Sequence, residues 1–188
     1  MKIPNAEVMS DWSTWITGGG LEPENIFMTC VSGPTTLFAE QWPLFMQATL
    51  HPKLVTKERG ARSKKTPELL YHVYLLGALQ GLRPHGWELE PECRTGRGYI
   101  DIRLRKKRDA VVIELKSSET EQQLERDADA ALDQIIANNY RNRYSHLGVD
   151  CIREYGIASF HLQSVVKARY LIRSGNGWLE KDDPSLAR

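Results

Sequence analysis

Two runs of alternating polar and apolar residues, 98–104 and 110–116, constrain the fold of this chain more than any other feature. The charged stretch 106–109 lies between them, so the two runs are predicted to be adjacent strands of a hairpin. Because strand side chains alternate between the two faces of a sheet, Glu114 and Lys116 share a face with Val112. A carboxylate and an ammonium group therefore interrupt a strongly apolar strand.

The first run contributes a second carboxylate, Asp101, which can converge with Glu114 from the neighbouring strand. Tyr99 and Arg103 share its predicted face. The opposite face carries apolar residues: Ile100, Ile102 and Leu104. Two carboxylates suit a hard cation such as Mg²⁺, which polarises a phosphate and lowers the pKa of a bound water, and Lys116 would lie beside that water. The alternative interpretation is an ion pair on the polar face of an amphipathic hairpin.

The composition limits the class of protein. With 188 residues, the chain is long enough for one sizeable core. Its formal net charge of +1 gives no overall field that would attract a polyanion. Three cysteines without paired spacing argue against a disulfide framework and a zinc site. The chain has neither a signal-peptide pattern nor a segment of membrane-spanning length, so we expect a soluble intracellular protein of the cytoplasm or nucleus.

Residues 1–52 are predicted to form a helical extension separate from the rest of the chain, with helices over about 4–17, after Pro23 and after Pro34. Its large aromatic side chains are interpreted as packing residues rather than stacking platforms for bases, because they lie among other apolar residues. They are Trp12, Trp15, Phe27 and Trp42. Residues 53–65 carry six basic side chains and one acid. This stretch is either a solvated linker or a contact for phosphates.

A helix is predicted to begin at Thr66, which suits an N-cap, with Pro67 in the first turn. The helix is apolar on nearly every side up to Gly81, so we expect it to be buried against the sheet. Glu68 either complements the helix dipole in the first turn or supplies a further carboxylate to the metal site. His72 lies one turn later on the same face, where it is either a hydrogen-bonded core residue or a residue that lines the site.

A long helix is predicted over about 121–144. Gln134 lies beside its apolar packing stripe, and a buried amide needs hydrogen-bond partners. Gln134 is therefore expected either to cap a nearby backbone group or to point into the site. Arg141, near the end of this helix, suits the helix dipole and could also meet phosphate.

Three further strands are predicted, over 86–92, 154–160 and 165–172. Glu92 either joins the acidic cluster or is a solvated strand end. Residues after 175 are expected to form a frayed tail.

An aspartate on one strand followed by Glu-x-Lys on the next resembles the signature of the PD-(D/E)xK nuclease superfamily, with Ile100 in place of the usual proline. The predicted order of elements also matches the α/β, restriction-endonuclease-like core of that superfamily: a mixed central sheet flanked by helices, here with an N-terminal helical extension. A closer resemblance is to the PD-(D/E)xK domain found C-terminal to AAA-ATPase-like domains. It rests on short motifs in the same order: 67–72 with 76–77, 96–101, 113–116, 131–135 with Tyr140, and 155–160. Residues 3–8 resemble the segment where the ATPase-like domain ends.

The resemblance implies a set of site residues. Glu68, Asp101 and Glu114 would be metal ligands, and Lys116 the catalytic lysine. Gln134 would match the glutamine of the family's following helix, whereas Tyr99 stands where the family often has an arginine. The implied organisation is an extension from an ATPase-like region (1–52), a nuclease-like domain (53–175) and a C-terminal tail (176–188). No nucleotide-binding loop is present, so we expect no ATPase activity from these residues.

We therefore predict a metal-dependent nuclease that hydrolyses phosphodiester bonds, with Mg²⁺ or alternatively Mn²⁺ as cofactor and DNA favoured over RNA. Two alternatives stay open. A non-catalytic nucleic-acid-binding module would keep the fold and bind through 53–65 in a salt-sensitive manner. A protein-interaction domain would serve an AAA-ATPase-like partner, which the near-zero net charge favours. No membrane partner is expected, and the sequence does not indicate an oligomeric state.

Overall fold

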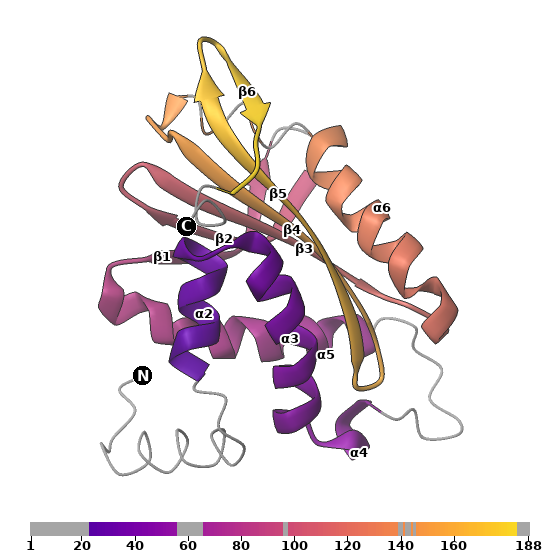
Figure 1. The fold of residues 1–188 in the computed structure, drawn as a ribbon. Helices are drawn as coiled ribbons and strands as arrows, with labels where there is room; N and C mark the ends of the chain where they lie inside the picture. Colours follow the sequence, from indigo (N-terminus) through magenta and orange to yellow (C-terminus); the bar gives the residue numbers. More distant parts are fainter. Residues whose placement is uncertain are drawn as a thin grey trace.

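The computed structural model describes residues 23–55, 66–95, 98–138, 141, 144 and 146–183. Within these residues, six strands form one sheet in the order β1-β2-β3-β4-β5-β6 (Figure 1). They are β1 (Glu88–Thr95), β2 (Gly98–Lys106), β3 (Asp109–Ser117), β4 (Cys151–Phe160), β5 (Gln163–Ser174) and β6 (Gly177–Glu180). Neighbouring strands are antiparallel except β3 and β4, which are parallel. The mixed sheet with flanking helices confirms the predicted α/β, restriction-endonuclease-like fold class.

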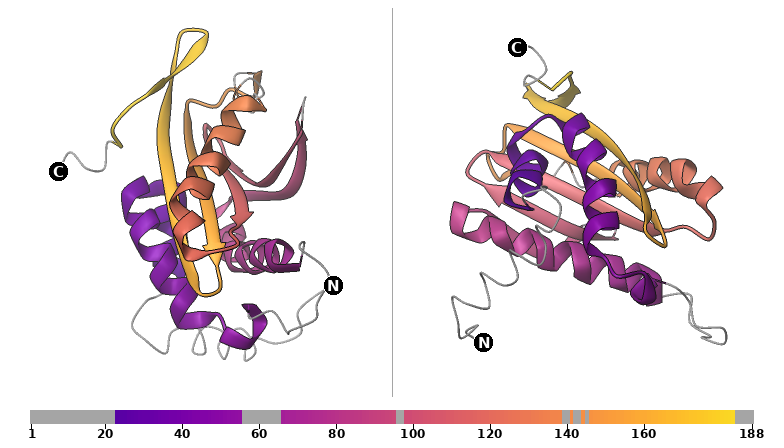
Figure 2. Two further views of the ribbon diagram at one scale, coloured as in Figure 1. Left: turned by 90° about the vertical axis from the view of Figure 1, so that its right-hand side faces the viewer. Right: turned by 60° about the horizontal axis from the view of Figure 1, so that its bottom comes forward.

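Helices cover both faces of the sheet. The α-helices are α2 (Pro23–Ser32), α3 (Thr35–Thr49), α4 (Pro52–Val55), α5 (Thr66–Leu79) and α6 (Leu124–Ala137), with short 3-10 helices η1 (Gln80–His85) and η2 (Glu121–Gln123). Helices α2, α3 and α5 pack on one face, while α6, in the crossover between β3 and β4, packs on the other (Figure 2). None of the helices described is both long and apolar enough to cross a lipid bilayer.

The alternation along β3 divides the apolar core between the two faces. Val111, Ile113 and Leu115 join the core cluster of α2, α3 and α5. Residues of the other face, such as Val112, pack with Leu132 and other residues of α6. The predicted alternation of β3 is therefore confirmed, and it directs Glu114 and Lys116 to the side of α6.

The N-terminal helices share the core of the sheet. Helices after Pro23 and Pro34 are confirmed as α2 and α3. The ring centroid of Phe38 lies 4.8 Å from that of Tyr155 on β4, and the Tyr155 hydroxyl donates to Cys30 O at 3.0 Å. Trp42 and Phe27 are buried, as expected for packing residues, whereas Trp12, Trp15 and the helix expected over 4–17 lie outside the described residues. Helices α2 and α3 are therefore not separate from the sheet, because their aromatic side chains complete its core.

Residues 177–180 form strand β6 where a frayed tail is expected, and residues 184–188 lie outside the described residues. Gly175 has a φ of 57°, and the two-residue turn at 175–176 joins β5 to β6. Beyond β6, the buried carboxylate of Asp183 accepts a hydrogen bond from the Thr35 N–H at the start of α3, at 3.0 Å. The Gly-Asn pair between two strands is the sequence signal for this hairpin.

The bounds of β1 and α6 also differ from the predicted ones. β1 begins at Glu88 and continues to Thr95, because Gly86 with a φ of 84° ends η1 just before it. α6 ends at Ala137 rather than near residue 144, and its first turn is preceded by η2. Of the basic stretch 53–65, residues 53–55 belong to α4 and the remainder lies outside the described residues.

Candidate active site

Strand β2 leaves β3 at Asp101. The ladder between the two strands runs from Lys106 opposite Asp109 to Ile102 opposite Ile113 and does not include Asp101. Instead, Asp101 accepts a hydrogen bond at Oδ2 from the Leu115 N–H, at 2.8 Å. The carboxylate thus replaces a backbone partner of β3 and is held beside the Glu-x-Lys motif.

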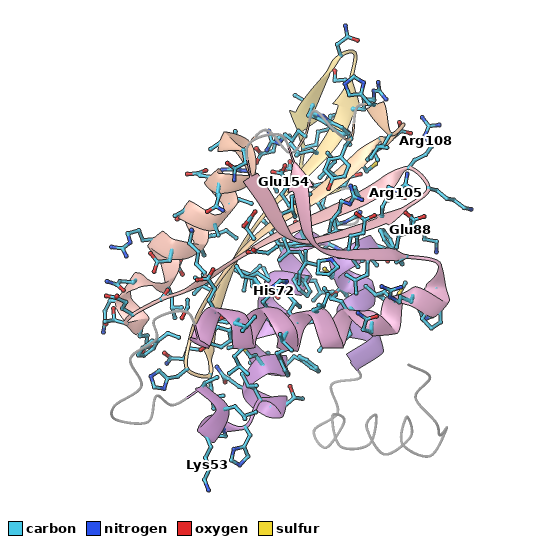
Figure 3. The ribbon with its side chains drawn as sticks, turned by 180° about the vertical axis from the view of Figure 1, so that it is seen from behind. Lys53, His72, Glu88, Arg105, Arg108 and Glu154 are labelled. Atoms are coloured by element: carbon cyan, nitrogen blue, oxygen red, sulfur yellow. The ribbon has the colours of Figure 1, made fainter. Side chains whose placement is uncertain are left out.

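His72 of α5 holds the backbone of the same aspartate. Its Nε2 lies 3.0 Å from Asp101 O, and because a carbonyl oxygen only accepts, Nε2 carries the proton. His72 lies between α5 and the sheet, on the side of the sheet opposite α6 (Figure 3). The contact agrees with both alternatives for His72, since a hydrogen-bonded core residue and a residue that lines the site could each make it.

The end of the β2–β3 ladder also changes the face of Ile100. The sequence predicts that Ile100 shares a face with Ile102 and Leu104, and this prediction is wrong. Ile102 and Leu104 are buried in the cluster of α5, whereas Ile100 is buried in the cluster of α6. Strict alternation requires a regular ladder, and β2 is no longer paired with β3 at this position.

Glu114 is a carboxylate in the interior of the molecule. It lies on β3 opposite Gly156 of β4, one residue beyond the end of the ladder to β2, and only 2% of its surface is exposed. One carboxylate oxygen, Oε2, accepts a hydrogen bond from Gln134 Nε2 at 3.3 Å. Burying an ionised carboxylate is costly unless it is compensated, and a cation bound beside Glu114 would contribute to that compensation.

Gln134 of α6 bridges the two ends of the Glu-x-Lys motif. Its Oε1 accepts from Lys116 Nζ at 3.0 Å, while its Nε2 donates to Glu114. The orientation of the amide is fixed by chemistry, because an ammonium only donates and a carboxylate only accepts. Gln134 thus points into the site, as one of the two alternatives predicted.

Glu68 is less closely associated with the other predicted ligands. It lies in the first turn of α5 with an exposed side chain, one turn before His72 on the same face. Across the described part of the chain, no three His, Cys, Asp or Glu side chains are grouped so that they could hold a metal ion. The structure therefore brings together Asp101, Glu114, Lys116 and Gln134. The side chains of Glu92 and Tyr99 lie outside the described residues.

Strand β4 also carries a carboxylate that forms a buried ion pair. Arg141 donates two hydrogen bonds to the carboxylate of Glu154, each at 2.7 Å, and Glu154 has no exposed surface (Figure 3). The hydrogen bonds to Glu154 raise the pKa of Arg141. Arg141 was expected to meet the helix dipole or phosphate, and it binds this carboxylate instead. An acid within the apolar run 154–160 is the sequence signal for such a partner.

The four grouped side chains offer oxygen ligands and a cationic donor at one place on the sheet. Asp101 and Glu114 present carboxylates from β2 and β3, and Lys116 presents an ammonium group two residues from Glu114. Such a set can bind a hard divalent cation together with an anionic group such as a phosphate.

A family model described as the PD-(D/E)XK nuclease superfamily matches residues 66–169, more than half of the 188 residues. The matched region begins with α5 and ends within β5, and thus contains the five predicted site residues. A search of curated proteins finds no match to the chain.

Proposed function

The chain belongs to the PD-(D/E)XK nuclease superfamily, and on this premise we propose that it is a metal-dependent nuclease that hydrolyses phosphodiester bonds in DNA. The observation that carries the proposal is the bridge from Lys116 through Gln134 to buried Glu114, beside the fixed carboxylate of Asp101. A fold alone does not need these four polar groups at the centre of an apolar sheet.

Nucleases of this superfamily generally use divalent metal ions. Asp101 and Glu114 fit such an ion, because Mg²⁺ is usually bound by one or two carboxylates together with water and substrate phosphate. When bound, the cation would neutralise charge on the scissile phosphate and lower the pKa of a water molecule. We propose Mg²⁺, with Mn²⁺ as the alternative, and Glu68 as a further carboxylate on the face of α5 that carries His72.

The residues of the chain itself orient the reactants. The Leu115 N–H and His72 hold the side chain and the backbone of Asp101. Lys116 either positions the water or donates toward the phosphate, where negative charge increases during the reaction. Gln134 accepts from Lys116 Nζ, so the ammonium group is held in place before the substrate binds.

The proposal extends to an AAA-ATPase-like partner domain. It rests on the motifs of residues 67–160 and on the likeness of residues 3–8 to the end of such a domain. DNA as the substrate rests on the same resemblance. The comparison of DNA with RNA substrates tests the choice of substrate separately from the chemistry of the site.

The test is cleavage of labelled double-stranded and single-stranded DNA and RNA in the presence of Mg²⁺, Mn²⁺ or a chelator. Wild type is compared with Lys116→Ala and with a charge-matched control, Lys181→Ala, whose side chain is exposed beyond β6. Metal-dependent cleavage of DNA that is lost only in Lys116→Ala is the expected result. A folded wild-type chain that cuts none of the substrates would overturn the proposal and favour a binding or protein-interaction role.

A further inference from the structure

Gly156 of β4 lies directly beside Glu114 in the parallel register of β3 and β4. A Cβ atom at this position would lie 2.4 Å from Ala128 O, 2.5 Å from Leu132 N and 2.9 Å from Leu132 Cβ. The first two atoms belong to the backbone of α6, and they are acceptor and donor positions four residues apart on one helical turn. The helix backbone therefore rests on the bare backbone of β4 at the level of Glu114.

The backbone conformation does not account for a glycine here. Among the described residues, the glycines with positive φ are Gly86, Gly148 and Gly175. Gly156 lies within a regular strand that is paired on both sides. Glycine is otherwise unfavourable there, because it loses more backbone entropy on folding than other residues and has no side chain to pack. Close approach of α6 is thus the reason that a side chain is absent.

The same helix carries Gln134, two residues after Leu132. Its amide lies 3.3 Å from Glu114 Oε2, close to the outer limit of a hydrogen bond. Ordinary contact with a Cβ begins at 3.4 Å, so an alanine at 156 would push α6 away from the sheet by about 1 Å, since backbone atoms cannot rotate aside. A displacement of that size would carry the amide out of hydrogen-bond distance.

We propose that Gly156 is a positioning residue, which lets α6 approach β4 closely enough for Gln134 to bridge Glu114 and Lys116. Its effect on catalysis rests on the proposed nuclease function, whereas its effect on the position of Gln134 does not. The two are tested by different measurements.

The first measurement is the side-chain amide signal of Gln134 in a ¹⁵N NMR spectrum of the full chain, assigned by its loss in Gln134→Ala. In Gly156→Ala, this signal is expected to move to the position of a solvent-exposed glutamine. The matched control is Gly77→Ala on α5, where an added Cβ meets no atom within 4 Å and the signal should not move. An unchanged Gln134 signal in folded Gly156→Ala would overturn the proposal.

The second measurement is a double-mutant cycle on the cleavage rate. Gly156→Ala and Gln134→Ala should each slow cleavage by a similar factor, and the double variant should be no slower than either. A double variant whose loss is the product of the two single losses would show that Gly156 does not act through Gln134. If wild type does not cleave, the proposed nuclease function fails while the NMR comparison still decides the role of Gly156.

If Gly156→Ala does not fold, a shorter side chain at residue 134 tests whether the distance between its amide and Glu114 matters. Gln134→Asn withdraws the amide while leaving α6 in place, and it should slow cleavage as much as Gln134→Ala. Wild-type cleavage by Gln134→Asn would contradict the need for this close approach.

Discussion

Removal of Arg141 should destabilise the protein strongly, although 22% of its side chain is exposed. Glu154 is completely buried and receives two hydrogen bonds of 2.7 Å from the guanidinium group. In Arg141→Ala the carboxylate would remain buried without this cation, and breaking such a pair costs about 3–5 kcal/mol of unfolding free energy. The loss corresponds to a decrease in Tm of roughly 10 °C for a domain of this size.

The assay is urea unfolding followed by far-UV circular dichroism. Arg126→Ala is the matched control, because Arg126 on α6 pairs with Asp127 at the surface, with 70% of its side chain exposed. Arg126→Ala should lower the unfolding free energy by no more than about 1 kcal/mol. The double variant Arg141→Leu with Glu154→Leu should recover most of the lost stability, because two apolar side chains leave no buried charge. An Arg141→Ala variant as stable as Arg126→Ala would refute the reasoning.

Three further predictions concern stability and thiol reactivity. Burial raises the pKa of Tyr71 to about 12, so its folded state binds a proton more tightly than the unfolded state with its pKa near 10. The resulting contribution to the unfolding free energy is complete below about pH 10 and is lost as the pH rises toward 12. In urea unfolding at a series of pH values, Tyr71→Phe should therefore lose less stability over this range than wild type. Burial also raises the pKa of the Cys30 thiol, so the native protein should react with a thiol reagent at half-buried Cys151 long before Cys30; equal rates would contradict this order. Asp183→Ala should lower the unfolding free energy by about 1–2 kcal/mol, since the Thr35 N–H at the start of α3 loses its acceptor; an unchanged urea midpoint would contradict the role of this contact.

The centre of the site could be predicted from the sequence because its determinants are local. Alternation along β3 is enough to direct Glu114 and Lys116 to one face of the sheet. Residues of α6 pack on that face. Gln134 was expected to need partners because it lies beside an apolar stripe, and Glu114 and Lys116 provide them.

Other features depend on partners that are distant in the sequence. The face of Ile100 follows from the departure of β2 from β3, which no alternation pattern records. Glu154 of β4 and Arg141 are 13 residues apart and meet only in the folded protein, and Asp183 reaches Thr35 across 148 residues. The strand after Gly175 is hard to predict for a different reason, because its apolar residues are few and only the turn indicates it.

The most direct test of the account is metal-dependent DNA cleavage by Asp101→Ala, Glu114→Ala and Lys116→Ala, each shown to be folded by circular dichroism and compared with wild type and Lys181→Ala. The proposed site predicts that each of the three substitutions abolishes cleavage, whereas the Lys181→Ala control cleaves like wild type. Retained cleavage in any two of the three variants would contradict the assignment of this site as the active site.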